Sequence, residues 1–298
     1  NFKYFFRDFL AGTFYIQKPS WGRTPGGGNR KTEKEQRLLN TTGSVSMKLN
    51  EAQYALLIDL AYREAGINLK GKHRLIETRL FQRFRQLGLT SVDDYFRRLR
   101  SDPAERSSFI DAIATTHTFF FRESGTFKYL RKGSAASIWC AACSSGEEPF
   151  SVVMDCLEKG FAPLVLATDL SRNMLDLAQK GVYPPDKIKK MDERMLAKYF
   201  RISGEGPLRT VSVREEVRRQ VTFKAFNLVT DDMPGRRFDV IFCRNVMIYF
   251  DLPTRKKVLD KLHESLKQKG YLIVGGAESL SFLDHPYRFI EPSVYQKV

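Results

Sequence analysis

Cysteine, histidine and long apolar runs are scarce in this sequence, and each shortage narrows the class of protein. Only four cysteines occur in 298 residues. They lie in apolar or strand-like surroundings, which indicates reduced, cytosolic usage rather than a disulfide framework. No uninterrupted apolar run reaches the length that spans a bilayer, and Lys3, Arg7 and Asp8 break the aromatic opening, so we predict no signal peptide. We therefore expect a cytoplasmic protein without direct membrane insertion.

Acidic residues are few compared with basic ones. The chain has 49 Lys and Arg against 34 Asp and Glu, a formal net charge of +15. Such a charge indicates an acidic partner, which on this number alone is nucleic acid, anionic lipid or an acidic protein surface. The length and the 42% hydrophobic content are enough for two domains with one sizeable core.

The pattern along the chain predicts an all-α domain followed by an α/β domain. Residues 1–46 lack periodicity and contain a glycine-rich basic stretch, so we expect a flexible basic extension. Residues 47–115 have the apolar spacing of four helices, and 116–135 form a linker. Strands and helices alternate over 136–298, which predicts a parallel sheet with crossover helices. A polar, β-prone insertion at about 192–220 predicts a small antiparallel subdomain.

The expected strands are short apolar runs, and the helices follow capping residues or have an apolar stripe. The four N-terminal helices are expected from Asn50 to Gly66, over 70–87, from Ser91 and over 103–115. The strands of the sheet are expected at 138–142, 164–168, 221–226, 238–243 and 271–275, with one or two late antiparallel strands within 289–298.

The stretch IWCAACSSGEEPFS, from Ile138 to Ser151, combines a strand, a tight glycine turn and a helix start. Nucleotide-binding α/β domains use this form to bring backbone close to a ligand. Two carboxylates, Glu147 and Glu148, stand where a phosphate-binding loop has Lys and Ser or Thr. A pyrophosphate would be repelled there, whereas S-adenosylmethionine, a sulfonium on an adenosine, fits. The alternative is that the acids only complement the helix dipole.

Asp169 ends the next expected strand, about twenty residues after the glycine turn. An acid at this strand tip is where a doubly wound sheet binds ribose hydroxyls. The alternative is that Asp169 only caps the helix that begins at Ser171. Arg244 and Asn245 follow a later strand, at the edge where a substrate meets a cofactor. Arg122 is either a surface charge or a cation that lines the cleft.

Arginines are dense on the expected helices of the N-terminal domain. Arg79 and Arg83 lie one turn apart at the edge of the apolar stripe, and Arg74 points away from it. These arginines are either a solvated surface or a docking face for an acidic substrate.

Together these motifs resemble the chemotaxis receptor methyltransferases, the CheR family. The resemblance covers about residues 48–298 and rests on the FFRE linker, the GEEP turn, the Thr-Asp strand tip, the Asn-Leu pair and CRNVMIYF. It implies a Rossmann-like sheet, S-adenosylmethionine as cofactor, no metal, and methylation of receptor glutamates. The implied cofactor contacts are Thr116, Thr118, Arg122, Glu148, Asp169, Asn227, Leu228, Arg244 and Asn245.

The resemblance also implies that Arg122 and Tyr249 face the methyl-transfer site. The implied partner is the cytoplasmic helical bundle of a chemotaxis receptor. From the density of arginines on the helices, we predict Arg74, Arg79 and Arg83 as its docking residues. We expect a monomer that is recruited to membrane receptor arrays and binds no nucleic acid. Thr116 departs from the asparagine common in the family, and it loses an amide's simultaneous donor and acceptor.

The implied chemistry requires no catalytic base. A glutamate side chain has a pKa of roughly 4.3, so the acceptor is already ionised at neutral pH. Among the four histidines, only His117 lies near the expected site, and we assign it a structural role.

Three alternatives compete with this interpretation. Trp139 to Cys143 imitates a WCxxC redox site, although the acids that follow have no role in a dithiol enzyme. The basic charge suggests a nucleic-acid methyltransferase, but Arg244 to Val246 lacks the Asp/Asn-Pro-Pro-aromatic turn. The third is a degenerate module that binds receptors without turnover, which Thr116 alone supports. The receptor, the role of residues 1–46 and the binding of a receptor tether by the β subdomain stay open.

Overall fold

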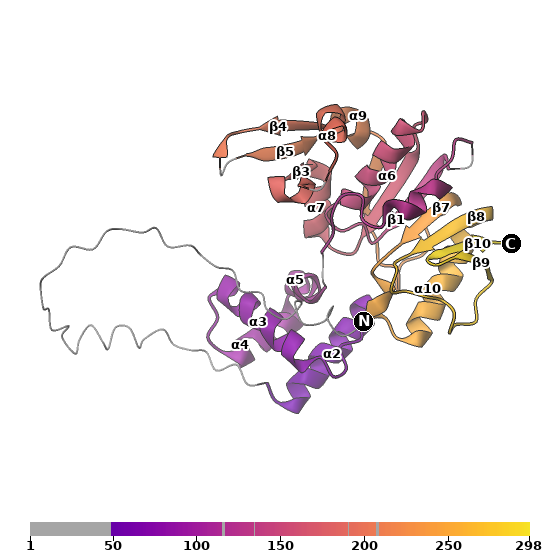
Figure 1. Cartoon of the computed structure of the whole chain (residues 1–298). Helices are drawn as coiled ribbons and strands as arrows, with labels where there is room; N and C mark the ends of the chain where they lie inside the picture. Colours follow the sequence, from indigo (N-terminus) through magenta and orange to yellow (C-terminus); the bar gives the residue numbers. More distant parts are fainter. Residues whose placement is uncertain (1–48, 115–116, 134, 190, 207–208) are drawn as a thin grey trace, which may run out of the picture. The chain divides into compact units, whose positions relative to one another are not determined.

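The computed structural model describes residues 49–114, 117–133, 135–189, 191–206 and 209–298 (Figure 1). The extension expected at residues 1–46 and the predicted cofactor contact Thr116 lie outside the described residues. None of the helices in the described part of the chain is long and apolar enough to cross a membrane.

Four helices pack around their own hydrophobic core ahead of the sheet. Asn50 and Gln53 form a reciprocal cap at the first of them, and Gly66 ends it in the left-handed conformation. Ile76, Leu80 and Phe84 are the buried residues of the second helix, as its apolar spacing predicts. The four helices are α2 (Glu51–Ala65), α3 (His73–Leu87), α4 (Val92–Ser101) and α5 (Pro103–Ile113).

Seven strands form the main sheet in the order β6-β2-β1-β7-β8-β10-β9. The first five in this order run parallel, and β10 and β9 are each antiparallel to their neighbours. The strands are β1 (Ser137–Ala141), β2 (Leu164–Asp169), β6 (Val221–Ala225), β7 (Phe238–Cys243), β8 (Leu266–Val274), β9 (Tyr287–Glu291) and β10 (Val294–Lys297). The helices between them are α6 (Glu147–Glu158), α7 (Arg172–Lys180) and α10 (Leu252–Ser265).

The strand order reverses between β1 and β7, because the chain builds β2 and β6 on one side of β1 and then returns to place β7 on the other. In open α/β sheets a ligand binds in the crevice beyond the carboxyl ends of the strands at such a switch point. The loops that follow β1 and β7 therefore face each other across the expected site.

The strand β8 begins at Leu266, five residues before the expected start at 271. The first half of β8 contains the exposed residues Lys267 to Lys269, and Lys269 has a φ of 61°. This polar, irregular start resembles a loop in sequence, which is why the apolar pattern located only the second half of the strand.

A second sheet of three antiparallel strands, in the order β3-β5-β4, lies in the insertion. Its strands β4 (Phe200–Ser203) and β5 (Thr210–Val213) fall within the range 192–220, but β3 (Val182–Tyr183) precedes it. A strand of two residues has no periodicity to detect. Two short helices, α8 (Glu193–Tyr199) and α9 (Glu215–Arg218), belong to the same region.

A buried hydrogen bond between β1 and β2 gives a test of this core. The indole Nε1 of Trp139 donates to Oγ1 of Thr168 at 2.9 Å, and both side chains are buried. Thr168→Val keeps the shape but leaves the indole N–H unpaired, so we expect a loss of about 1–3 kcal/mol in the free energy of unfolding. Urea unfolding measures it, with Thr168→Ser as the control that keeps the hydroxyl. Equal stability of the valine variant and the wild type would contradict this assignment.

Candidate functional site

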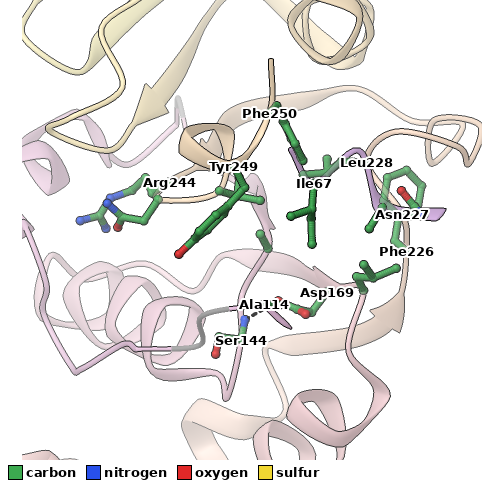
Figure 2. Close-up of a pocket in the computed structure, with 15 residues that line it drawn as sticks. Ile67, Ala114, Ser144, Asp169, Phe226, Asn227, Leu228, Arg244, Tyr249 and Phe250 are labelled. Carbon is green, nitrogen blue, oxygen red and sulfur yellow. Dashed lines mark hydrogen bonds between the residues drawn. The ribbon is translucent and has the colours of Figure 1, made fainter. Parts of the chain in front are cut away.

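A cavity of about 710 Å³ lies at the carboxyl ends of β1, β2 and β7, and residues of the helical domain complete its wall. We call it the apolar compartment. In Figure 2 the ring of Tyr249 points into it, with Arg244 on one side and Ile67, Phe226 and Leu228 on the other. Its further lining residues include Ala114, Ser144, Asp169, Asn227, Asn245 and Phe250.

A second hollow of about 500 Å³ adjoins the first, and we call it the polar compartment. The two share four lining residues, Ala142, Ser144, Arg244 and Asn245. Its other lining residues include His117, Thr118, Arg122, Glu148 and Ser151. The pair forms one cleft suited to a ligand with an apolar aromatic end and a charged end.

The cleft gathers the residues that the sequence predicted. Nine cofactor contacts were expected, and the eight of them that lie in the described residues all line one compartment or the other. Arg122 lines the polar compartment and Tyr249 the apolar one. Their contact with a ligand stays a prediction.

Asp169 ends β2 and faces the apolar compartment. Its Oδ2 accepts the backbone N–H of Ser144 at 2.7 Å, and its Oδ1 accepts that of Ser171 at 2.9 Å. Burial raises the pKa of Asp169, and the two N–H groups partly oppose this. Each oxygen keeps a further lone pair for a ligand hydroxyl. The carboxylate therefore holds the turn after β1 and still has acceptor capacity toward the cleft.

The glycine turn needs close backbone approach. Gly146 has a φ of 93°, and a Cβ there would lie 2.8 Å from the Cβ of Ala178. The hydroxyl of Tyr183 donates to the carbonyl of Ser145 at 2.7 Å, which ties the small sheet to the turn. Only glycine meets both the left-handed conformation and the space.

Glu147 was not among the predicted site residues, and it is fully buried. Its Oε1 accepts Nζ of Lys187 at 2.8 Å, and the same ammonium donates to the carbonyl of Thr118 at 2.9 Å. Lys187 lies between β3 and α8, and it thus links this segment to the start of α6 and to the linker. The position of Glu147 beside the glycine turn can be recognised in the sequence, but its pairing with Lys187, forty residues later, cannot.

Arg244 is buried at the centre of an ionic network. It pairs with Glu148 at 3.0 Å and with Glu123 at 3.1 Å, and it donates to the carbonyl of Arg122 at 2.6 Å. Burial raises the pKa of Glu148, and the adjacent Arg244 charge partly opposes this. Two predicted cofactor contacts, Arg244 and Glu148, therefore bind each other and fix the linker that contains Arg122.

Asn227 joins the sheet to the helical domain. Its Nδ2 donates to the carbonyl of Glu64 at 2.6 Å, while its Oδ1 accepts the N–H of Val229. The N–H of Asn68 donates to the carbonyl of Tyr249 at 2.8 Å and adds a second link. The helical domain is thus fixed to two loops of the cleft.

The three arginines predicted for docking do not share one surface. Arg79 and Arg83 line a hollow beside the start of α7, whereas Arg74 is exposed and lies about 140–180° around α3 from them, at 100° per residue. Arg83 also forms two hydrogen bonds with the buried carboxylate of Glu105. The docking role of the three arginines stays a prediction.

The WCxxC hypothesis is wrong. Cys140 and Cys143 are free and buried, and burial raises the pKa of both thiols well above the usual value. A redox-active cysteine needs the opposite, an accessible thiol with a lowered pKa.

Comparison with known proteins gives the class and then the family. A family model for the CheR methyltransferase SAM binding domain matches residues 116–295, and one for the CheR all-alpha domain matches residues 52–114. These matches identify an S-adenosylmethionine-dependent methyltransferase with its helical partner domain. The chain belongs to the CheR methyltransferase family.

Similar relatives span nearly the same length. The chemotaxis protein methyltransferase of Escherichia coli is 36% identical and is covered over 92% of its length by 84% of this chain. The chemotaxis protein methyltransferase of Borreliella burgdorferi is 33% identical, and the match covers 97% of that protein and 85% of this chain. Chemotaxis protein methyltransferase 2 of Pseudomonas aeruginosa is 36% identical, and the match covers 89% of that protein and 78% of this chain.

Replacement of Asp169 tests its predicted contact with the cofactor. We expect Asp169→Ala to weaken S-adenosylmethionine binding at least tenfold, about 1.4 kcal/mol, because both a ribose partner and the support of Ser144 are lost. Calorimetric titration measures the affinity. Asp176→Ala removes an exposed carboxylate from α7 and serves as the matched control. Wild-type affinity in a folded Asp169→Ala variant would remove this assignment.

Proposed function

We propose that this methyltransferase esterifies glutamate side chains of chemotaxis receptors with the methyl group of S-adenosylmethionine. The observation that carries the proposal is the two-part cleft, in which one side offers apolar walls and a carboxylate and the other offers Arg122 and Glu148. When bound, S-adenosylmethionine supplies a methyl group on a positively charged sulfur.

The described residues fit this cofactor by their chemistry. Phe226 and Leu228 offer an apolar surface to an adenine ring, and Asp169 offers acceptors to ribose hydroxyls. Arg122 and Glu148 in the polar compartment offer opposite charges to a zwitterionic amino-acid end. Glu148 suits an ammonium and Arg122 a carboxylate.

The protein's part in the reaction is alignment and exclusion of water. A glutamate acceptor is ionised at neutral pH, so no side chain has to remove a proton. Holding a carboxylate oxygen in line with the reacting carbon can supply on the order of 7–11 kcal/mol. Arg122, in the polar compartment, holds a carboxylate, either that of the acceptor or that of the cofactor. Tyr249 lines the apolar compartment.

Receptor docking is proposed on the side of α3 that carries Arg79. Arg79 lies in a hollow with Gln82 and Gln86, polar groups that suit an acidic helical surface. Asp111 also lines this hollow, and the amide of Asn173 donates to its carboxylate at 2.8 Å. Arg83 lies there too but already neutralises Glu105. The cytoplasmic bundle of a receptor is the proposed partner, which places the enzyme at receptor arrays.

Salt and charge replacement separate docking from cofactor binding. Methylation of a receptor fragment should slow as salt rises past physiological strength, while the affinity for S-adenosylmethionine barely changes. Arg79→Ala should raise the KM for the receptor severalfold. Arg85→Ala is the matched control, because it removes the same charge from an exposed position about 120° around α3 from Arg79.

Arg83→Ala is unsuitable for this test, since it would remove two hydrogen bonds from the buried carboxylate of Glu105 and leave it only the longer ion pair with Arg98 at 3.8 Å. That loss would destabilise the helical domain. Turnover that is independent of salt, or equal KM values for the Arg79 and Arg85 variants, would point to another docking surface.

The product distinguishes the proposed reaction from other methylations. A methyl ester on a glutamate hydrolyses in mild alkali and releases volatile methanol, whereas N-methyl and C-methyl products survive. Receptor fragment labelled with radioactive S-adenosylmethionine should therefore lose its label to the vapour phase. Acceptor Glu→Asp changes should reduce labelling severely, because the shorter side chain withdraws the oxygen from in-line geometry. Label that resists alkali, or that enters RNA instead, would overturn the proposal.

A further inference from the structure

We infer that Glu278 is a positioning residue for the loop Asn245 to Tyr249, and so for the tyrosine that faces the reaction. The inference rests on the proposed function, because that function gives Tyr249 its place at the methyl-transfer site. Glu278 lies in the loop after β8 and does not line either compartment.

The contacts of Glu278 connect two neighbouring loops of the sheet. Its side chain is buried, with a 2% exposed fraction. Oε2 accepts the N–H of Asn245 and the N–H of Gly275, each at 2.7 Å, and Oε1 accepts the N–H of Ile248 at 3.2 Å. One carboxylate thus satisfies two N–H groups of the loop after β7 and one at the end of β8.

The loop after β7 needs such a partner. Asn245 has a φ of 59°, a left-handed conformation that asparagine tolerates better than most non-glycine residues. Buried N–H groups without an acceptor are also costly, and a charged acceptor forms stronger hydrogen bonds than a neutral one. The carboxylate therefore stabilises this loop conformation through its hydrogen bonds to the N–H groups of Asn245 and Ile248.

The conformation of this loop positions residues at the junction of the two compartments and in the apolar compartment. Asn245 lines the two compartments at their junction. Ile248 lies within the short 3-10 helix η4 (Met247–Tyr249), directly before Tyr249. A shift at the Ile248 N–H would move the ring of Tyr249, while a shift at Asn245 would alter the junction.

The contacts of Glu278 leave no space for a side chain at Gly275. A Cβ at position 275 would lie 2.6 Å from Nδ2 of Asn245 and 2.7 Å from Oε2 of Glu278. The neighbouring Gly276 has no atom within 4 Å of such a Cβ. The two glycines are therefore a matched pair, one packed against the contacts of Glu278 and one free.

The central experiment is Glu278→Gln. Glutamine has one acceptor oxygen, which can take the place of Oε2 and keep the two shorter bonds, but its amide then faces the N–H of Ile248. We expect kcat for receptor methylation to fall about tenfold or more, with the Kd for S-adenosylmethionine changed less than about threefold. Hydrogen exchange of the segment 244–250 should become faster.

Asp239→Asn is the control for general destabilisation. Asp239 also accepts a backbone N–H, that of Ser137 at 2.8 Å, but at the amino end of β7. The Asp239→Asn variant should have lower thermal stability, but it should not show a fall in kcat with an unchanged Kd for S-adenosylmethionine. As a second arm, Gly275→Ala should weaken cofactor binding and methylation through Asn245, and Gly276→Ala should leave both near the wild-type values.

Each outcome decides the question. A folded Glu278→Gln variant with wild-type kcat and exchange would overturn the inference, as would losses of kcat and Kd that parallel those of Asp239→Asn. Absence of receptor methylation by the wild type would instead defeat the proposed function. Hydrogen exchange at 244–250 and cofactor affinity in the Gly275 and Gly276 pair would still test the positioning role.

Discussion

The cleft depends on carboxylates that are removed from water and bound to backbone N–H groups or cations. Asp169 holds the turn after β1, Glu278 holds the loop after β7, and Glu148 and Glu147 engage Arg244 and Lys187. Burying a charge is expensive unless it is fully paired. These carboxylates are paired, and the loops that pair them cannot relax independently. A site made of loops thereby gains the rigidity of the sheet below it.

The same constraint explains why the linker and the insertion belong to the site. Arg244 binds the carbonyl of Arg122, and Lys187 binds the carbonyl of Thr118. Two cations from distant parts of the sequence thus fix the segment that leads from the helices to β1. On the other side, Gly66 approaches Val229 so closely that a Cβ would lie 2.7 Å from its side chain. The helical domain is packed against the cleft as a wall.

Local signals in the sequence predicted the sheet and the position of the cleft. Apolar runs located the strands, and the spacing between Gly146 and Asp169 indicated the ligand edge, because both signals depend on residues close in sequence. The pairing of Glu147 with Lys187 and of Arg83 with Glu105 could not be predicted, since each partner is one of many charges on a distant element. The role of Glu278 could not be predicted for a related reason. Its partners are backbone N–H groups, which nearly every residue has, so the sequence contains no signal for them. Helical geometry, however, already separated Arg74 from Arg79.

The origin of the walls of the apolar compartment has a consequence for inhibitor selectivity. Ala65, Ile67 and Ala114 line this cavity but come from the helical domain or its edges. An adenosine analogue that binds only the sheet residues would meet surfaces that any methyltransferase of this architecture can offer. An analogue extended by a small apolar group toward Ile67 would gain contact area that only a chain with this helical wall provides. Discrimination among methyltransferases would then come from the helical domain and not from the sheet.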